Sequence, residues 1–119
     1  MAANENPKVT IIVAAYNSQD TIEECLKSIL ALDYPSGCVE VIVMDGESKD
    51  STVKIAEQLP IKVVSMRLNA PAAYNYAMKI ASHAVLGFID ADAKVEADWL
   101  KKLVPVSYTH LTLPTILLV

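Results

Sequence analysis

The stretch Val85-Leu86-Gly87-Phe88-Ile89-Asp90-Ala91-Asp92 determines how the rest of the chain is interpreted. Four of the five residues before Asp90 are bulky and apolar, which is typical of a strand buried on both faces of a sheet. This predicted strand ends in two carboxylates one residue apart, at the end where open α/β sheets bind ligands. Mg²⁺ and Mn²⁺ prefer oxygen ligands and commonly join one or two carboxylates to phosphate oxygens. Asp90 and Asp92 are therefore predicted to form a metal–phosphate site, and the alternative is a solvated loop with incidental acids.

Three further runs of apolar, mostly β-branched residues predict strands at residues 9–15, 39–44 and 61–64. Lys62 favours an edge position for the last of them. The segments between the strands have apolar residues at helical spacing, which predicts helices that begin near residues 22, 52, 70 and 95. This alternation predicts an α/β fold with a doubly wound, mostly parallel sheet, flanking helices and right-handed crossovers.

Polar residues mark the helix starts and the strand ends. Asp20 or Thr21 is expected to cap the first helix, each with a Glu three residues later in capping-box spacing, and Asp50 or Ser51 is expected to cap the second. The loops of interest follow the strands: they carry Tyr16, Asp45 and the Asp90–Asp92 pair. Because parallel strands end at the same edge of a sheet, these loops are expected to converge on one crevice.

Composition excludes several classes of protein. The chain has 119 residues, 53% of them apolar and 20% charged, which fits one globular domain or part of one. A net charge of −4 and scattered basic residues argue against a nucleic-acid surface or a polybasic membrane patch. The two cysteines, Cys25 and Cys38, are expected to be free thiols. No signal peptide or membrane-spanning run is recognised, so the expected location is the cytoplasm.

The two ends of the chain differ from its middle. Residues 1–7 are polar and are expected to be a disordered lead-in. Residues 105–119 contain no Asp, Glu, Lys or Arg, whereas the preceding 104 residues hold all 10 basic and 14 acidic side chains. Residues 106–115 resemble the translation of a transposon-based sequencing adapter. The segment 105–119 is therefore interpreted as a non-native tail, with a natural hydrophobic interaction tail as the alternative.

Several segments in combination resemble the family 2 glycosyltransferases, whose nucleotide-sugar half has the fold called GT-A. The resemblance covers residues 8–104 and rests on order and spacing as well as on residue types. The segments are VTIIVAAYN at 9–17, IEECLKSIL at 22–30, YP at 34–35, VIVMDGESKDST at 41–52, FIDAD at 88–92 and DWL at 98–100.

The resemblance implies a role for each matching position. Ala14 and Tyr16 correspond to positions that line the nucleobase pocket, and Asp45 resembles the acid that hydrogen-bonds the uracil ring in members that use uridine nucleotides. In the Asp-x-Asp motif, Asp90 would face the ribose or nucleotide and Asp92 would ligate Mg²⁺ or Mn²⁺ against the diphosphate. The implied activity is metal-assisted transfer of a sugar from a nucleotide-diphosphate donor, a UDP-sugar by this resemblance, to an acceptor hydroxyl.

The chain also departs from the family pattern. Many members have Asp-Asp-Gly-Ser where this chain has Asp45-Gly46-Glu47-Ser48, and many have Ala-Arg-Asn where it has Ala73-Tyr74-Asn75. Nothing after Leu103 resembles the half of the domain that binds the acceptor and supplies the general base. The chain is therefore expected to be a donor-binding fragment, inactive alone, of a parent protein whose acceptor (a glycan, a lipid or a protein) and membrane association are open.

Two other classes remain as alternatives. A haloacid-dehalogenase-type phosphatase also ends a strand in Asp-x-Asp, and there Asp90 would be a covalent nucleophile and Asp92 an acid/base. That family has the motif on its first strand, whereas three predicted strands come first here. The second alternative is a non-catalytic nucleotide-binding module. A dinucleotide-binding oxidoreductase is rejected because the turn after the first strand, Ala15-Tyr16-Asn17, has no glycine.

Overall fold

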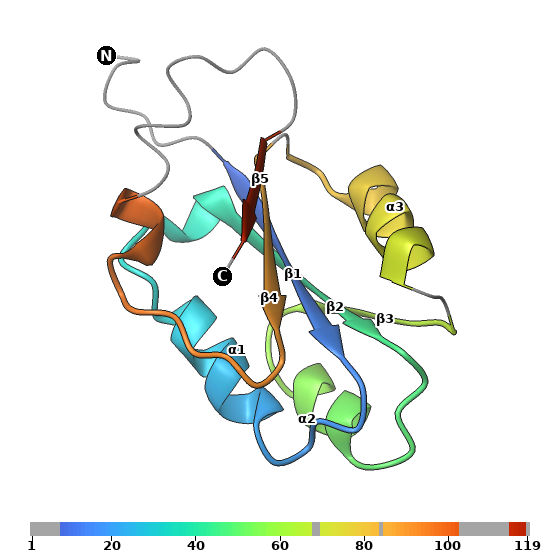
Figure 1. The fold of residues 1–119 in the computed structure, drawn as a ribbon. Coiled ribbons are helices and arrows are strands. Elements are labelled where there is room, and N and C mark those ends of the chain that lie inside the picture. Colours follow the sequence, from blue (N-terminus) through green and yellow to red (C-terminus); the bar gives the residue numbers. More distant parts are fainter. Residues whose placement is uncertain (1–7, 68–69, 84, 103–114, 119) are drawn as a thin grey trace.

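Parallel strands form the centre of the protein. The structure, a computed structural model, describes residues 8–67, 70–83, 85–102 and 115–118 (Figure 1). Within these residues a five-stranded sheet has the order β3-β2-β1-β4-β5, with all neighbouring strands parallel. The strands are β1 (Val9–Ala15), β2 (Val39–Asp45), β3 (Lys62–Ser65), β4 (Val85–Asp90) and β5 (Thr115–Leu118). The predicted α/β class and the edge position of β3 are confirmed.

Helices cover both faces of the sheet. They are α1 (Ile22–Leu30), α2 (Thr52–Glu57) and α3 (Ala70–Ile80), with a 3₁₀ turn η2 (Ser36–Cys38) before β2 and helical residues at 99–102. In Figure 1, α3 lies on the opposite side of the sheet from α1. Of the predicted last helix, the described residues 99–102 are helical, whereas residues 95–96 at its expected start have no regular structure.

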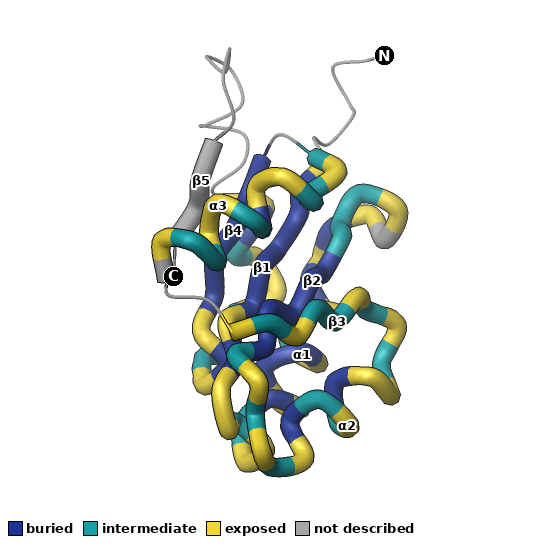
Figure 2. The backbone as a smooth tube through the Cα atoms, turned by 90° about the vertical axis from the view of Figure 1, so that its right-hand side faces the viewer, coloured by how far each residue is buried: buried dark blue, intermediate teal, exposed yellow. Residues whose placement is uncertain are grey.

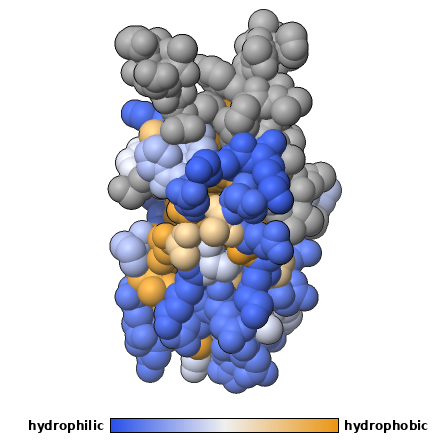
Figure 3. Space-filling view, turned by 90° about the vertical axis from the view of Figure 1, so that its left-hand side faces the viewer, coloured by the Kyte–Doolittle hydropathy of each residue, from blue (hydrophilic) through white to orange (hydrophobic). Residues whose placement is uncertain are grey.

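Two apolar clusters explain this arrangement. In β1 successive side chains point to opposite faces, so Ile11 and Val13 belong to one cluster and Ile12 to the other. The first cluster packs under α1, α2 and Leu100, and the second packs under Ala77 of α3. Figure 2 shows the central strands as buried and the surrounding loops as exposed. The face on the α1 side is mostly hydrophilic, and most of its hydrophobic residues gather across its middle (Figure 3).

The strand order reverses at β1. The chain adds β2 and then β3 on one side of β1, and after α3 it crosses to place β4 on the other side. In open α/β sheets, ligands bind outside the carboxyl ends of the strands at such a reversal. The fold therefore directs attention to the loops after β1, β2 and β4.

Two sequence-based expectations differ from the structure. Thr21 precedes α1, but its side chain makes no capping bond to the helix, so the predicted capping box does not form. The segment 105–119 is expected to lie outside the fold, yet Thr115–Leu118 pairs with Val85–Phe88 of β4. An apolar segment can add to an open strand edge by backbone pairing alone, so the pairing leaves the origin of this segment untested. Residues 1–7 and 103–114 lie outside the described part.

No helix in the described ranges combines the length and the apolar character that a membrane crossing requires.

Candidate functional site

Backbone bonds bring the predicted loops to one level at the carboxyl edge of the sheet. In the parallel register Asp45 lies beside Ala15 on one side and Ser65 on the other, and Ala14 lies beside Asp90. The amide of Gly46 donates to the Ala15 carbonyl at 2.9 Å, and the amide of Ala91 donates to the Ala14 carbonyl at 3.1 Å. The prediction that these loops meet at one edge of the sheet is confirmed, whereas the described residues that line the pocket at this edge come from the loops after β1 and β2 and do not include Asp90 or Asp92.

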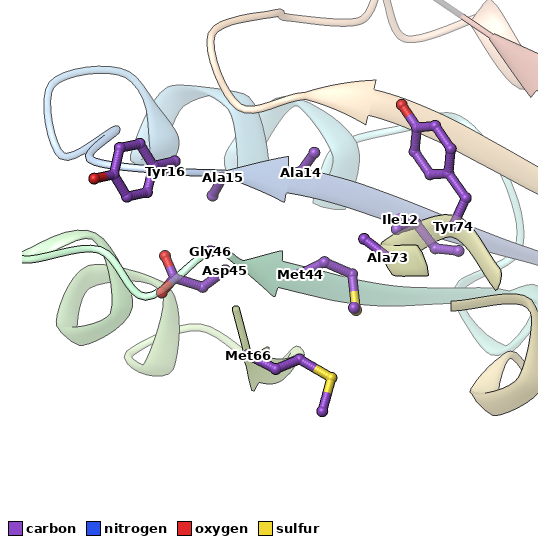
Figure 4. A pocket seen from close by; sticks show the side chains of 10 residues that line it. All are labelled: Ile12, Ala14, Ala15, Tyr16, Met44, Asp45, Gly46, Met66, Ala73 and Tyr74. Atoms are coloured by element: carbon purple, nitrogen blue, oxygen red, sulfur yellow. The ribbon is translucent and has the colours of Figure 1, made fainter. Parts of the chain in front are cut away.

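A pocket of about 290 Å³ lies at this edge, between the ends of β1 and β2 and the first turns of α3 (Figure 4). Of the site residues implied by the family resemblance, Ala14, Tyr16 and Asp45 line it, whereas Asp90 and Asp92 lie on the adjacent strand end. The walls are mainly apolar, as in pockets that take small organic ligands. The lining residues are Ile12, Ala14, Ala15, Tyr16, Met44, Asp45, Gly46, Met66, Ala73 and Tyr74.

Asp45 is buried, with an exposed fraction of 2%, and hydrogen bonds compensate its charge. Its Oδ2 accepts from the Ser48 amide at 2.8 Å and from the Ser65 hydroxyl at 3.1 Å. Its Oδ1 accepts from the Ser48 hydroxyl at 2.5 Å. A carboxylate offers about four acceptor positions, so one of them, on Oδ1, remains for a donor in the pocket.

Two tyrosines border the pocket from different elements. Tyr16, at the end of β1, is 60% exposed, and a side-chain atom added at Gly46 would lie in ordinary contact with its ring. Tyr74, on α3, is 43% exposed, and its ring meets Phe88 of β4 edge to face, with 4.8 Å between centroids. From the sequence, core packing or surface cover is favoured for Tyr74 over stacking on a base. Its position in the pocket depends on how α3 docks, which the local pattern does not specify.

Hydrogen bonds fasten the loop after β1 to the loop after β2, and we call residues 16–19 with 48–52 the loop clasp. The Asn17 amide donates to the Ser48 hydroxyl at 2.7 Å, and the Asn17 side chain accepts from the Lys49 amide at 2.8 Å. Asn17 has a φ of 47°, in the left-handed region that Asn tolerates better than most residues. The clasp holds the two loops that carry Tyr16 and Asp45.

Asp50 belongs to the loop clasp and fixes the start of α2. Its carboxylate accepts from the amide and the hydroxyl of Thr52 and from the amide of Gln19. Desolvation raises the pKa of Asp50, but these hydrogen bonds outweigh it and lower the pKa below its usual range. The expectation that Asp50 or Ser51 caps this helix is confirmed for Asp50, because the Ser51 side chain makes no capping bond.

Asp90 and Asp92 are both exposed, and no donor in the described residues contacts either carboxylate. Two exposed oxygen ligands fit a hard divalent cation that completes its shell with water and phosphate oxygens. The described residues contain no cluster of three or more metal-ligating side chains, so a cation here would depend on ligands from a bound molecule. The buried Cys25 thiol lies beneath these two residues and donates to the Asp90 carbonyl at 3.6 Å. Burial raises the pKa of this thiol to about 11, and the negative charges of Asp92 and then Asp90 add to the increase.

Together these features define an α/β domain with an apolar pocket and exposed carboxylates at the reversal of its strand order. The chain belongs to glycosyl transferase family 2, because the model of this family matches residues 10–111. This membership favours the glycosyltransferase hypothesis over the phosphatase and binding-module alternatives.

Similarity to individual glycosyltransferases supports the assignment of the chain to this family. Glycosyltransferase AglE of Haloferax volcanii is 32% identical over 103 residues, which are 81% of this chain and 34% of AglE. The structure of TarS 1–349 from S. aureus in complex with UDP has a TM-score of 0.76 and 32% identity, over 87% of this chain and 32% of that one. The mannosyltransferase PcManGT from Pyrobaculum calidifontis, solved with GDP-Man and Mn²⁺, has the same TM-score and identity. That match covers 92% of this chain and 34% of PcManGT. The chain thus spans about a third of each of these relatives.

Proposed function

We propose that this chain binds the nucleoside diphosphate of a UDP-sugar, and that the protein of which it is a part transfers the sugar to an acceptor hydroxyl. The observation that carries the proposal is the pocket at the strand reversal, with the Asp90–Asp92 pair on the adjacent strand end. Support also comes from the relatives, since TarS was solved with UDP and with UDP-GlcNAc and PcManGT with GDP-Man.

In this proposal each element of the site contacts a different part of the donor. Ala14 and Tyr16 border the nucleobase, and the open acceptor position of Asp45 takes one ring N–H. Asp90 faces the ribose or nucleotide, and Asp92 holds Mg²⁺ or Mn²⁺. When bound, such a cation offsets the negative charge that grows on the departing nucleoside diphosphate.

The proposal assigns donor binding to residues 8–104 and treats 105–119 as a non-native tail. The described residues that line the pocket lie between positions 12 and 74, and the carboxylate pair ends at 92. The acceptor site and its general base are assigned to parts of the protein that this chain does not contain.

A calorimetric titration of the chain with UDP, with and without Mn²⁺, tests the proposal. We expect binding that requires Mn²⁺ and that Asp92→Asn abolishes. The matched control is Glu57→Gln, which removes an exposed carboxylate on α2 that lines no part of the pocket. If the folded chain binds no UDP, or if Asp92→Asn binds as the unsubstituted chain does, the proposal is wrong.

A further inference from the structure

The hydrogen bonds around Asp45 also bear on which nucleobase the pocket accepts. Asp45 is the acidic residue among those that line the pocket, and its carboxylate is almost fully buried. Because Asp45 lines the pocket, a base edge that enters the pocket would meet the oxygens of its carboxylate as hydrogen-bond acceptors. How many of them are open decides how many N–H groups the base can pair with.

Oδ2 of Asp45 is fully used within the protein. A carboxylate oxygen has two lone pairs, and here the Ser48 amide occupies one at 2.8 Å and the Ser65 hydroxyl the other at 3.1 Å. These donors come from different elements, the loop after β2 and the end of β3. A ligand cannot pair with Oδ2 without displacing one of them.

Only one of the two lone pairs on Oδ1 of Asp45 accepts a hydrogen bond from the described residues. The Ser48 hydroxyl donates to Oδ1 at 2.5 Å, while its oxygen accepts from the Asn17 amide at 2.7 Å. One lone pair of Oδ1 remains. The pocket therefore offers a base a single charged acceptor rather than the two parallel acceptors of a free carboxylate.

We propose that Ser48 and Ser65 are positioning residues that set the nucleobase specificity of the donor site, by restricting Asp45 to one N–H from the ligand. Uracil presents one N–H, between two carbonyl groups, and matches this arrangement. Guanine presents two adjacent N–H donors that would pair with both oxygens of a free carboxylate, and here the second donor is left unpaired. An unpaired buried donor costs binding free energy, so guanine is disfavoured. This inference rests on the proposed function.

The test compares UDP with GDP, because both carry the same diphosphate and the contribution of the metal cancels. Calorimetric titrations at one Mn²⁺ concentration give the ratio of the two dissociation constants. We expect the unsubstituted chain to bind UDP more tightly by about tenfold or more, the difference that one hydrogen bond to a charged acceptor makes. Ser65→Ala opens a lone pair on Oδ2 and is expected to lower that ratio several-fold, chiefly through tighter GDP binding.

Two further variants complete the design. Ser48→Ala removes the hydroxyl donor to Oδ1 and is expected to lower the ratio as well, while Ser48→Thr retains a hydroxyl and is expected to restore it. Ser51→Ala is the matched control, because Ser51 is exposed, its hydroxyl makes no capping bond, and it joins the loop clasp through its backbone amide, which the substitution retains. Ser65 is itself exposed, so its substitution leaves the core intact, and circular dichroism checks this.

The outcomes separate the inference from the proposed function. Equal or tighter binding of GDP by the unsubstituted chain overturns the inference. So does a ratio in a folded Ser65→Ala variant that equals the ratio in Ser51→Ala. If the folded chain binds neither nucleotide, the proposed function is wrong and the inference falls with it.

Discussion

Asp90 on β4 lies directly beside Ala14 on β1, and the amide of Ala91 donates to the Ala14 carbonyl at 3.1 Å. This pairing places the Asp-x-Asp loop next to β1, the strand that Tyr16 follows. On the other side of β1, the amide of Gly46 bonds to the Ala15 carbonyl at 2.9 Å and places Asp45 at the same level. The backbone of three strands thus sets the positions of the site residues.

The contact between Tyr74 and Phe88 gives the first prediction. Tyr74→Ala removes an edge-to-face aromatic pair and one wall of the pocket. We expect a loss of about 1 kcal/mol in the free energy of unfolding, measured with urea, and weaker UDP binding. Tyr74→Phe retains the ring and is the control. Full stability and affinity in Tyr74→Ala would show that the ring contributes neither packing nor a binding surface.

The loop clasp gives the second prediction. Asn17→Ala places a residue that disfavours left-handed geometry at a φ of 47° and removes the acceptor for the Lys49 amide. We expect a loss of about 1 to 2 kcal/mol in the free energy of unfolding, together with a higher dissociation constant for UDP. Asn17→Asp retains an acceptor in a residue that tolerates this geometry, so it should lose less. If the two variants lose equal stability, the hydrogen bond between the Lys49 amide and the Asn17 side chain does not stabilise the fold.

Glu40 predicts how stability changes in acid. Burial raises its pKa, but hydrogen bonds from the Ser82 amide and from the hydroxyls of Thr10 and Ser82, with the charge of His83, lower it below the usual range. Because the folded-state pKa is the lower one, Glu40 stabilises the fold above its unfolded-state pKa of about 4.3 and loses this contribution as the pH falls through the folded-state value.

The measurement for Glu40 is urea unfolding of Glu40→Gln across pH. The unsubstituted chain should be the more stable of the two at pH 6, and the difference should shrink as the pH falls below about 4. The control Glu57→Gln removes an exposed carboxylate elsewhere and should show no such trend. A difference that does not change with pH would mean that the ionised carboxylate is not what stabilises this end of the sheet.

Removal of residues 105–119 gives the fourth prediction. The described residues of the pocket and of both core clusters all lie outside this segment, so circular dichroism and UDP affinity should be preserved. The deletion also exposes the edge of β4 that Thr115–Leu118 pairs with, and exposed edges promote association between chains. Size-exclusion chromatography should therefore show more self-association. Loss of the fold on deletion would contradict the interpretation of this segment as a non-native tail.

Strand positions could be predicted from the sequence because buried strands leave a local signal. The segments Val9–Ala15 and Val85–Asp90 consist almost entirely of apolar residues, and both strands form at those positions. The convergence of Tyr16, Asp45 and Asp90 followed from a rule about where parallel strands end. These predictions needed no knowledge of how individual side chains pack.

Features of the site that depend on pairs of distant residues could not be predicted from the sequence. Ser65 bonds to Asp45 across 20 positions and Asn17 bonds to Ser48 across 31, and neither pair shows in local patterning. The capping box at Thr21 had the right spacing, but the Thr21 hydroxyl makes no capping bond to α1. The Thr21 hydroxyl instead donates to the Ser18 carbonyl at 3.5 Å, a competing local bond that the capping-box spacing does not predict.

Nuclear magnetic resonance of the ¹⁵N-labelled chain during titration with UDP and Mg²⁺ tests the central claim most directly, because it locates the bound nucleotide. The account predicts that amide signals shift at the carboxyl edge of the sheet, at Tyr16, Gly46 and Ala91, and stay in place at its amino edge, at Gly37 and Ser82. Shifts confined to the amino edge, or no shifts at saturating UDP, would contradict it.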